Sequence, residues 1–504
     1  MKTLNLNLCS HPNPKILPRH SSSPVRSQCS LTQQHPLRFA VLGAGFAGLS
    51  VVWHLFKHSP KELNLKIDIY DEVGIGGGAS GISGGLLHPY SPKVKPLWEG
   101  AQCWNESIKL LRIAEEASLS RDCQVRESTE QYMKAFVVNK RGILRPAMDM
   151  KNMTKLNDNA KTCLPCCRVE PLNNEEAQGL LPGVLLPFNT AFFMPEALNI
   201  NPRHYLEVTT NFHSFSKYYK ELFLACENLV KESSSHDSGE KQLSLHKKSI
   251  HGLSEFEGEY DAVIICLGAK VNMLPEISGR LPLRTCRGVI VHLEPPDDTR
   301  CYPEDGPSIL SDAWIAVESS RSLNVGSTWE WKSINSSPNV SIEEASKALH
   351  ELLPKASTIY PGIRDWVFTG ARAGLRAMPP LTPLGSLPLL GCINDFIGRN
   401  RSCKYWLFGG LGSRGLLYHG WLGNLMAHAV LSCNEEDVKR NVGNNTVDPD
   451  SSSPFPPNSV DFSEVPVCIH SNGSCHLAMK APRSITPGRS TNDQLLDLVT
   501  KISA

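Results

Sequence analysis

The alternation of apolar and polar positions predicts a strand, a glycine turn, a helix and a second strand between residues 39 and 71. Residues 39–42 are apolar enough to form a buried parallel strand, and Ile67, Ile69 and Tyr70 belong to the next one. The apolar run continues through residue 56, which approaches the ~20 residues of a membrane span. His54 interrupts this run and glycines crowd its start, so we favour a helix packed against a sheet over a membrane span.

The same pattern predicts more elements further along the chain. The expected helices cover residues 97–117, 203–208, 217–230, 341–353 and about 421–431, and the expected strands cover 135–138, 262–266, 288–293, 323–328 and 404–408. We expect 288–293 and 323–328 to be antiparallel, and the segment TTNFHSFS at 209–216 to be an inserted loop. This order predicts an α/β fold in which a Rossmann-like sheet is completed by distant segments and an antiparallel sheet is threaded between them.

The glycine turn carries the spacing of a dinucleotide-binding fingerprint. Gly43, Gly45 and Gly48 fall at G-x-G-x-x-G, directly after the first strand and before the helix. The three glycines respectively permit the tight turn, the approach of the pyrophosphate and close helix–strand packing. Asp71 ends the second strand, where an acid can bind the hydroxyls of an adenosine ribose. The order of these elements therefore predicts a dinucleotide site.

Composition limits the classes of partner and compartment. The chain has 504 residues, 41% of them hydrophobic, and a formal net charge of +1, so no overall charge attracts nucleic acid or anionic membranes. Sixteen cysteines are scattered along it without a secretory signal, which favours free thiols in a reducing compartment. The cluster Cys163, Cys166 and Cys167 lacks a second ligand pair at suitable spacing. We therefore expect no bound metal.

The first 38 residues have the composition of an organellar transit peptide. They contain no acid, a serine-rich middle at 21–23, and the basic residues Lys2, Lys15, Arg19, Arg26 and Arg38. Their serine and proline content favours the chloroplast, with the mitochondrion or the cytoplasm as alternatives. The tail from residue 433 is rich in Ser, Pro and Asn, and we expect it to be disordered.

Four segments together resemble the D-amino-acid-oxidase-like family of FAD-dependent oxidoreductases. They are GAGFAG with Asp71, GGGASGISGG at 76–85, EYDAVIICLGA at 259–269 and GGLGSRGLLYHG at 409–420, and the resemblance covers residues 39–432. Within the family, GASG followed by GGLLHPYSP, VGSTWEW at 325–331, AGLR at 373–376 and GLGSRGL at 410–416 are most similar to one enzyme class. It is the FAD-dependent half of the bacterial bifunctional enzyme that makes 5-methylaminomethyl-2-thiouridine in tRNA.

The chain departs from that enzyme class in two respects. The spacer AMPPLTPLGSL after Arg376 contains no acid, whereas the family usually has a shorter spacer with an aspartate. We also expect the methyltransferase half to be absent. Both departures leave the tRNA substrate open.

The fingerprint and the resemblance together predict the domains and the cofactor contacts. The FAD-binding domain is expected at 39–110, 176–275 and 365–432, and the substrate domain at 111–175 and 276–364. FAD is expected to be held noncovalently. The expected contacts are Gly43, Gly45, Phe46, Ala47, Gly48, Asp71, Glu72, Ala79, Ser80, Gly81, Gly268, Gly410, Gly412, Ser413, Arg414 and Gly415.

The resemblance also implies three catalytic candidates. Arg376 matches the family's substrate arginine, whose planar guanidinium binds a carboxylate in two places. Arg414, in the last glycine turn, either stabilises the reduced flavin or touches the substrate. His88 either faces the flavin or is structural, and His419 is a weaker case of the same choice. Trp329 and Trp331 either line the substrate pocket or belong to the core.

Two other chemistries fit poorly. GISGG around Ser83 matches G-x-S-x-G, but it lies in a long glycine loop without the strand and helix of a nucleophile elbow. A nicotinamide dehydrogenase would explain the first fingerprint but not the later glycine turns.

The resemblance implies oxidation of a carbon–nitrogen bond next to a carboxylate, with oxygen or another electron acceptor, such as a quinone, taking the electrons. One candidate substrate is the carboxymethylaminomethyl group of a tRNA wobble uridine, for which Lys93, Lys95, Arg399, Arg401 and Lys404 are possible contacts. The second is glycine, sarcosine or a D-amino acid. The third alternative is an FAD-binding protein without turnover.

Overall fold

The computed structural model describes ten stretches of the chain. They are residues 36–125, 138–139, 142–206, 208–209, 218–219, 221–233, 239–398, 403–442, 468–469 and 475–476. The expected inserted loop lies mostly outside them, as do nearly all of the expected transit peptide and most of the expected disordered tail.

A mainly parallel sheet contains the dinucleotide fingerprint. Its first five strands, in spatial order, are β11 (Lys241–Lys247), β2 (Leu65–Asp71), β1 (Leu37–Leu42), β12 (Ala262–Ile265) and β22 (Lys404–Gly409), all parallel to their neighbours. Strand β21 (Leu389–Cys392) then pairs antiparallel with β22, and the short strands β23 (Cys468–Ile469) and β24 (Cys475–His476) continue the order. This confirms that segments far apart in sequence complete the sheet.

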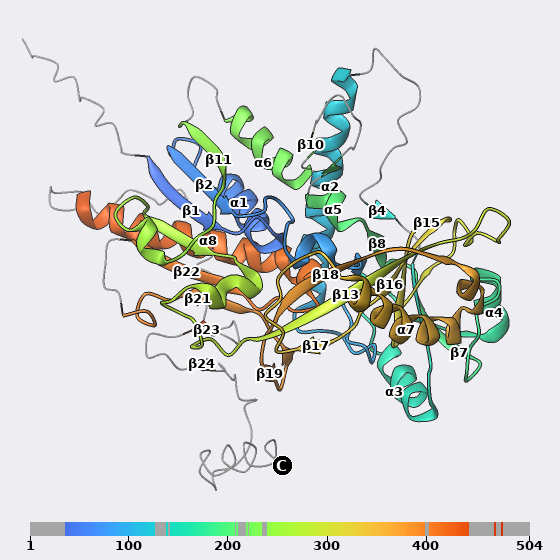
Figure 1. Ribbon diagram of the computed structural model, residues 1–504. Helices are drawn as coiled ribbons and strands as arrows, with labels where there is room; N and C mark the ends of the chain where they lie inside the picture. Colours follow the sequence, from blue (N-terminus) through green and yellow to red (C-terminus); the bar gives the residue numbers. More distant parts are fainter. Residues whose placement is uncertain are drawn as a thin grey trace, which may run out of the picture. The chain divides into compact units, whose positions relative to one another are not determined.

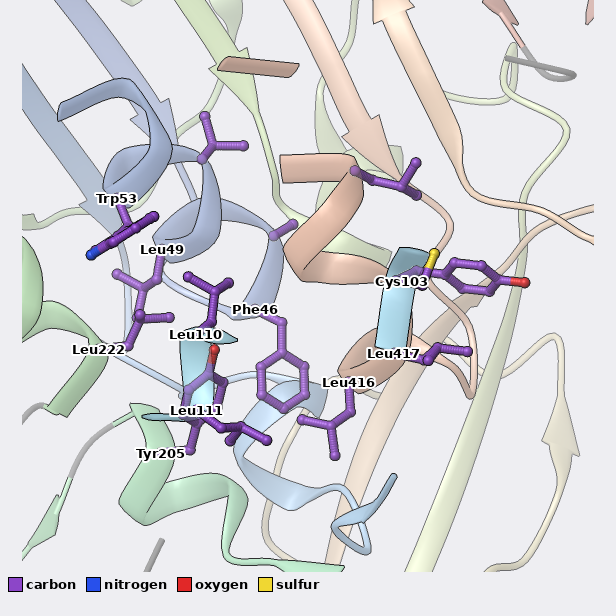
Figure 2. Close-up of a cluster of buried hydrophobic side chains, with 14 of the residues drawn as sticks. Phe46, Leu49, Trp53, Cys103, Leu110, Leu111, Tyr205, Leu222, Leu416 and Leu417 are labelled. Carbon is purple, nitrogen blue, oxygen red and sulfur yellow. The ribbon is translucent and has the colours of Figure 1, made fainter. Parts of the chain in front are cut away.

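Helices cover this sheet around α1 (Phe46–His58), which is buried from Phe46 through Phe56. A helix that is apolar on all sides must be enclosed, and α1 packs against α6 (Glu221–Glu232) and α8 (Gly415–Val442) (Figure 1). Helix α2 (Gly100–Val125) packs against the same two helices. Figure 2 shows side chains of these helices meeting around Phe46, Leu49, Leu110 and Leu416.

A second, mostly antiparallel sheet lies beside the first. Its order is β17 (Glu330–Trp331), β13 (Arg284–Glu294), β16 (Ser322–Gly326), β15 (Trp314–Ser319), β14 (Ser308–Ile309), β5 (Ile143–Pro146), β7 (Thr190–Met194) and β6 (Glu170–Asn173). The long strand β18 (Val367–Met378) also pairs with β13. Helix α7 (Ile342–Ile359) buries Ala348, Leu352 and Ala356 against this sheet in a second hydrophobic core.

The remaining elements are short. They are the 3₁₀ turns η1 (Ala79–Ile82), η2 (Leu253–Phe256), η3 (Gly268–Met273) and η4 (Pro361–Asp365), the helices α3 (Met150–Ala160), α4 (Asn174–Leu180) and α5 (Pro202–Leu206), and the strands β3 (Leu86–Leu87), β4 (Val138–Asn139), β8 (Leu198–Ile200), β9 (Val208–Thr209), β10 (Tyr218–Tyr219), β19 (Leu381–Thr382) and β20 (Gly385–Ser386).

Most expected elements are confirmed, and the antiparallel pairing of 288–293 with 323–326 is among them. The expected end of the helix at 353 is wrong, because α7 continues through Pro354 to Ile359. Burial of Ala356 and Ile359 compensates the hydrogen bond that a proline removes. The last helix was expected at 421–431 but extends from Gly415 to Val442, because buried Leu416 and Leu417 anchor its first turn.

Other expectations are corrected in detail. Tyr218 and Tyr219 form a strand rather than the start of the helix, and helix α3 was missed. Leu37 and Arg38 already pair with β2, so the first strand starts inside the segment expected to be a transit peptide, and the end of that segment stays a prediction.

Strand membership also differs from the expected domain boundaries. Strand β18 lies in a segment assigned to the FAD-binding domain, yet it pairs with β13 of the antiparallel sheet. Strand β7 likewise belongs to that sheet, whereas Leu111 and Ala114 of α2 pack in the core around α1. The described residues from Pro36 onward belong to one compact unit, and the domain boundaries stay a prediction.

No helix in the described stretches has the length and apolar character needed to cross a bilayer. Among the same residues, no group of three or more His, Cys, Asp or Glu side chains is placed to hold a metal ion. The thiols of Cys163, Cys166 and Cys167 are free.

Candidate functional site

Two glycines at the turn between β1 and α1 have no room for a side chain. Gly43 has a φ of +107°, and a Cβ built on it would lie 2.5 Å from the carbonyl oxygen of Cys266. A Cβ at Gly48 would lie 1.9 Å from the carbonyl oxygen of Gly43. The turn therefore brings the N-terminus of α1 directly against the carboxyl ends of β1 and β12, where a dinucleotide binds in parallel sheets.

The loop after β2 closes over this turn. Ser80 in η1 accepts a hydrogen bond from the backbone N–H of Phe46 at 3.1 Å, and a Cβ at Gly45 would lie 2.8 Å from the Ser80 hydroxyl oxygen. Ala79 and Gly81 lie in the same 3₁₀ turn. Ala47, like Phe46, is buried in the first turn of α1. The two glycine-rich segments predicted to bind the cofactor therefore meet.

Asp71 ties the end of β2 to both segments. Its Oδ2 accepts the N–H of Ala44 at 2.9 Å, and its Oδ1 accepts those of Val73 and Gly74 at 3.0 and 2.9 Å. Because each carboxylate oxygen has two lone pairs, Oδ2 keeps one acceptor position for a ribose hydroxyl. Glu72 instead forms an ion pair with Lys270 of η3, which lies two residues beyond Gly268. The structure thus places Glu72 and Gly268 on neighbouring segments.

The last glycine turn places Arg414 next to His88. Arg414 Nη1 lies 3.3 Å from His88 Nε2. A guanidinium can only donate, so Nε2 is the acceptor. Burial, together with the charges of Arg414 and Arg145, holds the pKa of His88 well below its usual range. His88 is therefore a neutral partner that orients Arg414.

The surroundings of Arg414 are cationic. Burial lowers its pKa, although the side chain keeps some surface exposure. Arg145, on β5, is buried and donates from Nη1 to the carbonyl oxygen of Leu310 at 2.7 Å. Within the described residues neither arginine forms an ion pair. Sequence patterns gave no signal for Arg145, because its neighbours come from distant strands.

Arg376 is held by backbone and hydroxyl groups of the antiparallel sheet. Its Nη2 donates to the carbonyl oxygen of Thr328 at 3.0 Å, its Nη1 to the Ser327 hydroxyl at 3.3 Å and its Nε to the carbonyl oxygen of Cys286 at 3.4 Å. Its guanidinium lies over the ring of Trp329, 4.1 Å from the centroid. No carboxylate pairs with it among the described residues, and burial lowers its pKa.

Two glycines make room for this arrangement. A Cβ at Gly288 on β13 would lie 2.4 Å from Arg376 Nη2. Gly374 lies two residues before Arg376 and hence on the same face of β18. A Cβ there would lie 3.2 Å from the Cα of Ala79 in η1. The face of β18 that carries Arg376 is therefore the face that contacts η1 in the loop after β2, which we call the cofactor loop.

The two arginines come from adjoining segments. The N–H of Gly412 donates to the carbonyl oxygen of Ala377 at 2.9 Å, and Cβ atoms at Gly410 and Gly412 would both contact Pro379. Ser413 is exposed. A Cβ at Gly415, which begins α8, would lie 3.3 Å from the Phe46 ring. The last glycine turn therefore bridges the N-terminus of α1 and the end of β18.

The structure shows the surroundings of three further candidates, His419, Trp329 and Trp331. His419 is buried in α8, where its Nδ1 donates to the carbonyl oxygen of Leu416 at 2.9 Å and its Nε2 accepts from the Tyr205 hydroxyl at 2.8 Å, so its role is structural. Trp329 and Trp331 are 47% and 45% exposed and are not core residues.

The basic candidates are scattered. Lys93 and Lys95 are exposed and Lys404 is partly buried. Arg399 and Arg401 lie outside the described residues.

Comparisons with known proteins agree with this geometry. A family model described as FAD dependent oxidoreductase matches residues 38–429. Over 173 residues the chain is 30% identical to YurR, an uncharacterized oxidoreductase of Bacillus subtilis (strain 168), a match that covers 34% of this chain and 42% of that protein.

Solved structures share the fold at low identity. Glycine oxidase from Geobacillus kaustophilus has a TM-score of 0.54 and 17% identity, covering 79% of this chain and 95% of its own. Iminodiacetate oxidase from Chelativorans sp. BNC1 has a TM-score of 0.52 and 18% identity, covering 78% and 95%. L-proline dehydrogenase from P. horikoshii has a TM-score of 0.54 and 13% identity, covering 79% and 94%.

Proposed function

The chain belongs to the family of FAD-dependent oxidoreductases, and we propose that it oxidises a carbon–nitrogen bond next to a carboxylate, in an N-substituted glycine or an amino acid. Arg376 is the observation that carries this proposal. It is a partly buried cation without an acidic partner among the described residues, on the sheet face that meets the cofactor loop.

The donors of Arg376 leave room for a carboxylate. Of its five N–H groups, three reach Thr328, Ser327 and Cys286, and a fourth contacts the Cys286 sulfur at 3.7 Å. An arriving carboxylate would take the free Nη1 donor and replace the weak sulfur contact, and its charge would offset the desolvation of the guanidinium. This would hold the carbon next to the amine in one position.

The glycine turn and the loop after β2 have the properties that FAD requires. We propose that its pyrophosphate lies at the N-terminus of α1, where the first turn contains no acid and Gly45 provides no side-chain cap. The remaining acceptor position of Asp71 would receive a ribose hydroxyl. When bound, FAD supplies a two-electron acceptor for the hydride that leaves the carbon, and the chain supplies position and charge. The resulting imine would hydrolyse.

The contacts of His88 and Arg414 narrow the roles that these two residues can have. His88 accepts from Arg414, so we assign it to orienting Arg414 rather than to proton transfer. Arg414 either balances negative charge on the reduced cofactor or contacts the substrate. The amine must arrive neutral, because its lone pair has to assist hydride departure.

The carboxymethylaminomethyl group of a tRNA wobble uridine is the substrate we propose first. The motifs GLGSRGL and VGSTWEW support it, as does the half-exposed Trp329, whose ring lies against Arg376. Oxidation and hydrolysis would release glyoxylate and leave an aminomethyl group on the base. Glycine, sarcosine or a D-amino acid is the second candidate, which the net charge of +1 favours.

Anaerobic bleaching of the flavin in the purified full chain tests both candidates. Glycine, sarcosine, D-amino acids and tRNA bearing carboxymethylaminomethyluridine are added separately. Bleaching by the tRNA alone supports the first substrate, and bleaching by a free amino acid supports the second. Arg376→Gln should abolish either reaction, whereas Arg168→Gln, in an exposed ion pair, should not. A flavin that no amine reduces would contradict catalysis and favour a binding protein without turnover.

The destination of the chain is a separate proposal. We propose import into the chloroplast, supported by the acid-free, serine-rich N-terminal segment.

A further inference from the structure

Two tryptophans stand together at the exposed end of the site. Trp329 and Trp331 have ring centroids 5.9 Å apart and an interplanar angle of 26°. They are 47% and 45% exposed, although such rings bury readily when a core can accept them. We call them the indole pair. Leaving two adjacent indoles open to water is costly, which points to a ligand that covers them.

Two guanidinium groups extend the indole pair. Arg376 lies over Trp329, with its Cζ 4.1 Å from the ring centroid, and Arg284 lies over Trp331 at 4.9 Å. Arg284 is at the exposed start of β13. Four planar groups therefore follow one another from the proposed carboxylate clamp to the surface. Indole and guanidinium planes are the groups on which proteins stack unpaired nucleic-acid bases.

We propose that the indole pair binds the uracil ring of the RNA nucleotide whose amine is oxidised. This inference rests on the proposed function and names the substrate class of the same site. It requires the base and the carboxylate to be bound together. Four bonds separate the carboxylate carbon from the ring carbon that carries the arm, a reach of about 5 Å when extended. Arg376 is in direct contact with the Trp329 ring, so a carboxylate at the free edge of the guanidinium and a base on the exposed part of the indole pair can belong to one nucleotide.

The charges near the indole pair fit a single-stranded RNA. Arg284 and Lys332 are both exposed and can approach phosphates. Glu330, between the two tryptophans, projects to the opposite side, because side chains alternate along an extended segment. A free amino acid would fill the clamp at Arg376 and leave the exposed parts of both indoles open to water, so the geometry favours the larger substrate.

Trp331→Ala tests the proposal in the flavin-loaded full chain, since the Arg376 guanidinium lies over the ring of Trp329 and not over that of Trp331. The probe is a short RNA stem-loop that carries carboxymethylaminomethyluridine in its loop. Its Kd is measured by fluorescence anisotropy with the oxidised protein, and its KM and kcat from anaerobic flavin reduction. We expect Kd and KM to rise about 5- to 150-fold, the range to which base–aromatic stacking converts, with kcat nearly unchanged.

Three comparisons separate this role from a structural one. Trp331→Phe should restore most of the affinity, and Ile334→Ala, which shortens a side chain that is 92% exposed nearby, should change nothing. Sarcosine, which has no ring, should keep its KM in Trp331→Ala if it is oxidised at all. Unchanged RNA affinity in Trp331→Ala would overturn the inference, and so would an equal loss for sarcosine. If no amine reduces the flavin but RNA affinity still depends on Trp331, the proposed function fails and the stacking site stands.

Discussion

Gly412 donates its backbone N–H to the carbonyl oxygen of Ala377 over 2.9 Å, and this bond joins the two sheets at the site. Ala377 follows Arg376 on the antiparallel sheet, and Gly412 precedes Arg414 by two residues in the turn after β22. The segments that carry the two proposed functional arginines are therefore joined by one backbone contact, whereas each guanidinium has partners of its own. Their distinct surroundings allow separate tests.

The space at Gly288 should be essential for the position of Arg376. Gly288→Ala would place a methyl group 2.4 Å from Arg376 Nη2 and displace the guanidinium. We expect kcat/KM for the amine to fall about 100-fold, the loss that a displacement near 1 Å can cause. Gly370→Ala on β18 is the matched control, because its nearest neighbour, His292, would lie 3.9 Å away. Equal activity of both variants, with flavin retained, would refute this role.

The contact between Gly48 and Gly43 should govern FAD retention. Gly48→Ala would place a Cβ 1.9 Å from the Gly43 carbonyl oxygen, so the turn must open. We expect FAD affinity to fall at least about tenfold, or 1.4 kcal/mol, measured as the flavin-to-protein absorbance ratio after gel filtration. Gly179→Ala in α4 has nothing within 4 Å of its new Cβ and should retain the flavin. A fully loaded Gly48→Ala protein would contradict the proposed pyrophosphate position.

The two alternatives for Arg414 differ in the quantity they change. If Arg414 balances charge on the reduced cofactor, Arg414→Gln should lower the flavin midpoint potential by about 30 mV or more, equivalent to about 1.4 kcal/mol for two electrons. If it contacts substrate instead, KM should rise while the potential stays constant. Potentiometry in the absence of substrate distinguishes them, with Arg168→Gln as the control. A variant that matches the unmodified protein in both quantities would exclude both roles.

Buried histidines should make the fold less stable in acid. Burial lowers the pKa of His419 to about 4, whereas an unfolded histidine titrates near ~6.5. Between these values the unfolded chain binds the proton more tightly, so stability is complete above pH ~6.5 and decreases as the pH falls toward 4. His419 alone should contribute a slope of about 1.4 kcal/mol per pH unit in that window.

Urea unfolding at several pH values between 7.5 and 4.5 measures this slope. His58, whose pKa burial also lowers to about 4, is only half-buried and should contribute less. His58→Gln should therefore flatten the curve slightly. An unfolding free energy that rises on acidification through this window would contradict the assignment.

The N-terminal segment should act as an import signal that ends before the first strand. Residues 1–36 fused to a fluorescent protein should direct it to chloroplasts in plant cells. The same fusion with Arg19 and Arg26 replaced by Glu should remain outside, because acids are poorly represented in such signals. Mitochondrial fluorescence would support the alternative organelle, and diffuse fluorescence would contradict import.

The sequence predicted best the parts of the fold whose signals are local. The fingerprint Gly43, Gly45 and Gly48 predicts its turn from the glycine spacing alone, because the closest contact of Gly48 is the Gly43 carbonyl oxygen within the same turn. The surroundings of Arg376 were not predictable in the same way. The groups that hold it are 48 to 90 residues away in sequence, and no periodicity indicates which carbonyl oxygens meet a guanidinium.

Exposure was the second quantity that the pattern did not determine. Trp329 and Trp331 have the spacing of core residues on a strand, but both are nearly half exposed, and their rings contact each other and two arginines. Likewise, the start of α8 depended on whether Leu416 and Leu417 would be buried in the hydrophobic core. Both outcomes follow from tertiary packing, which a single sequence specifies only indirectly.

The position of β12 in the sheet affects how the chain can fold during synthesis. It pairs with β1 on one side and with β22 on the other, and residues 266–403 must be translated between β12 and β22. At about 5–20 residues per second, this leaves one edge of β12 unpaired for roughly 7–28 s. An open parallel edge can pair with another nascent chain. Slow translation after residue 265 would therefore increase aggregation, and a chaperone bound to this edge would prevent it.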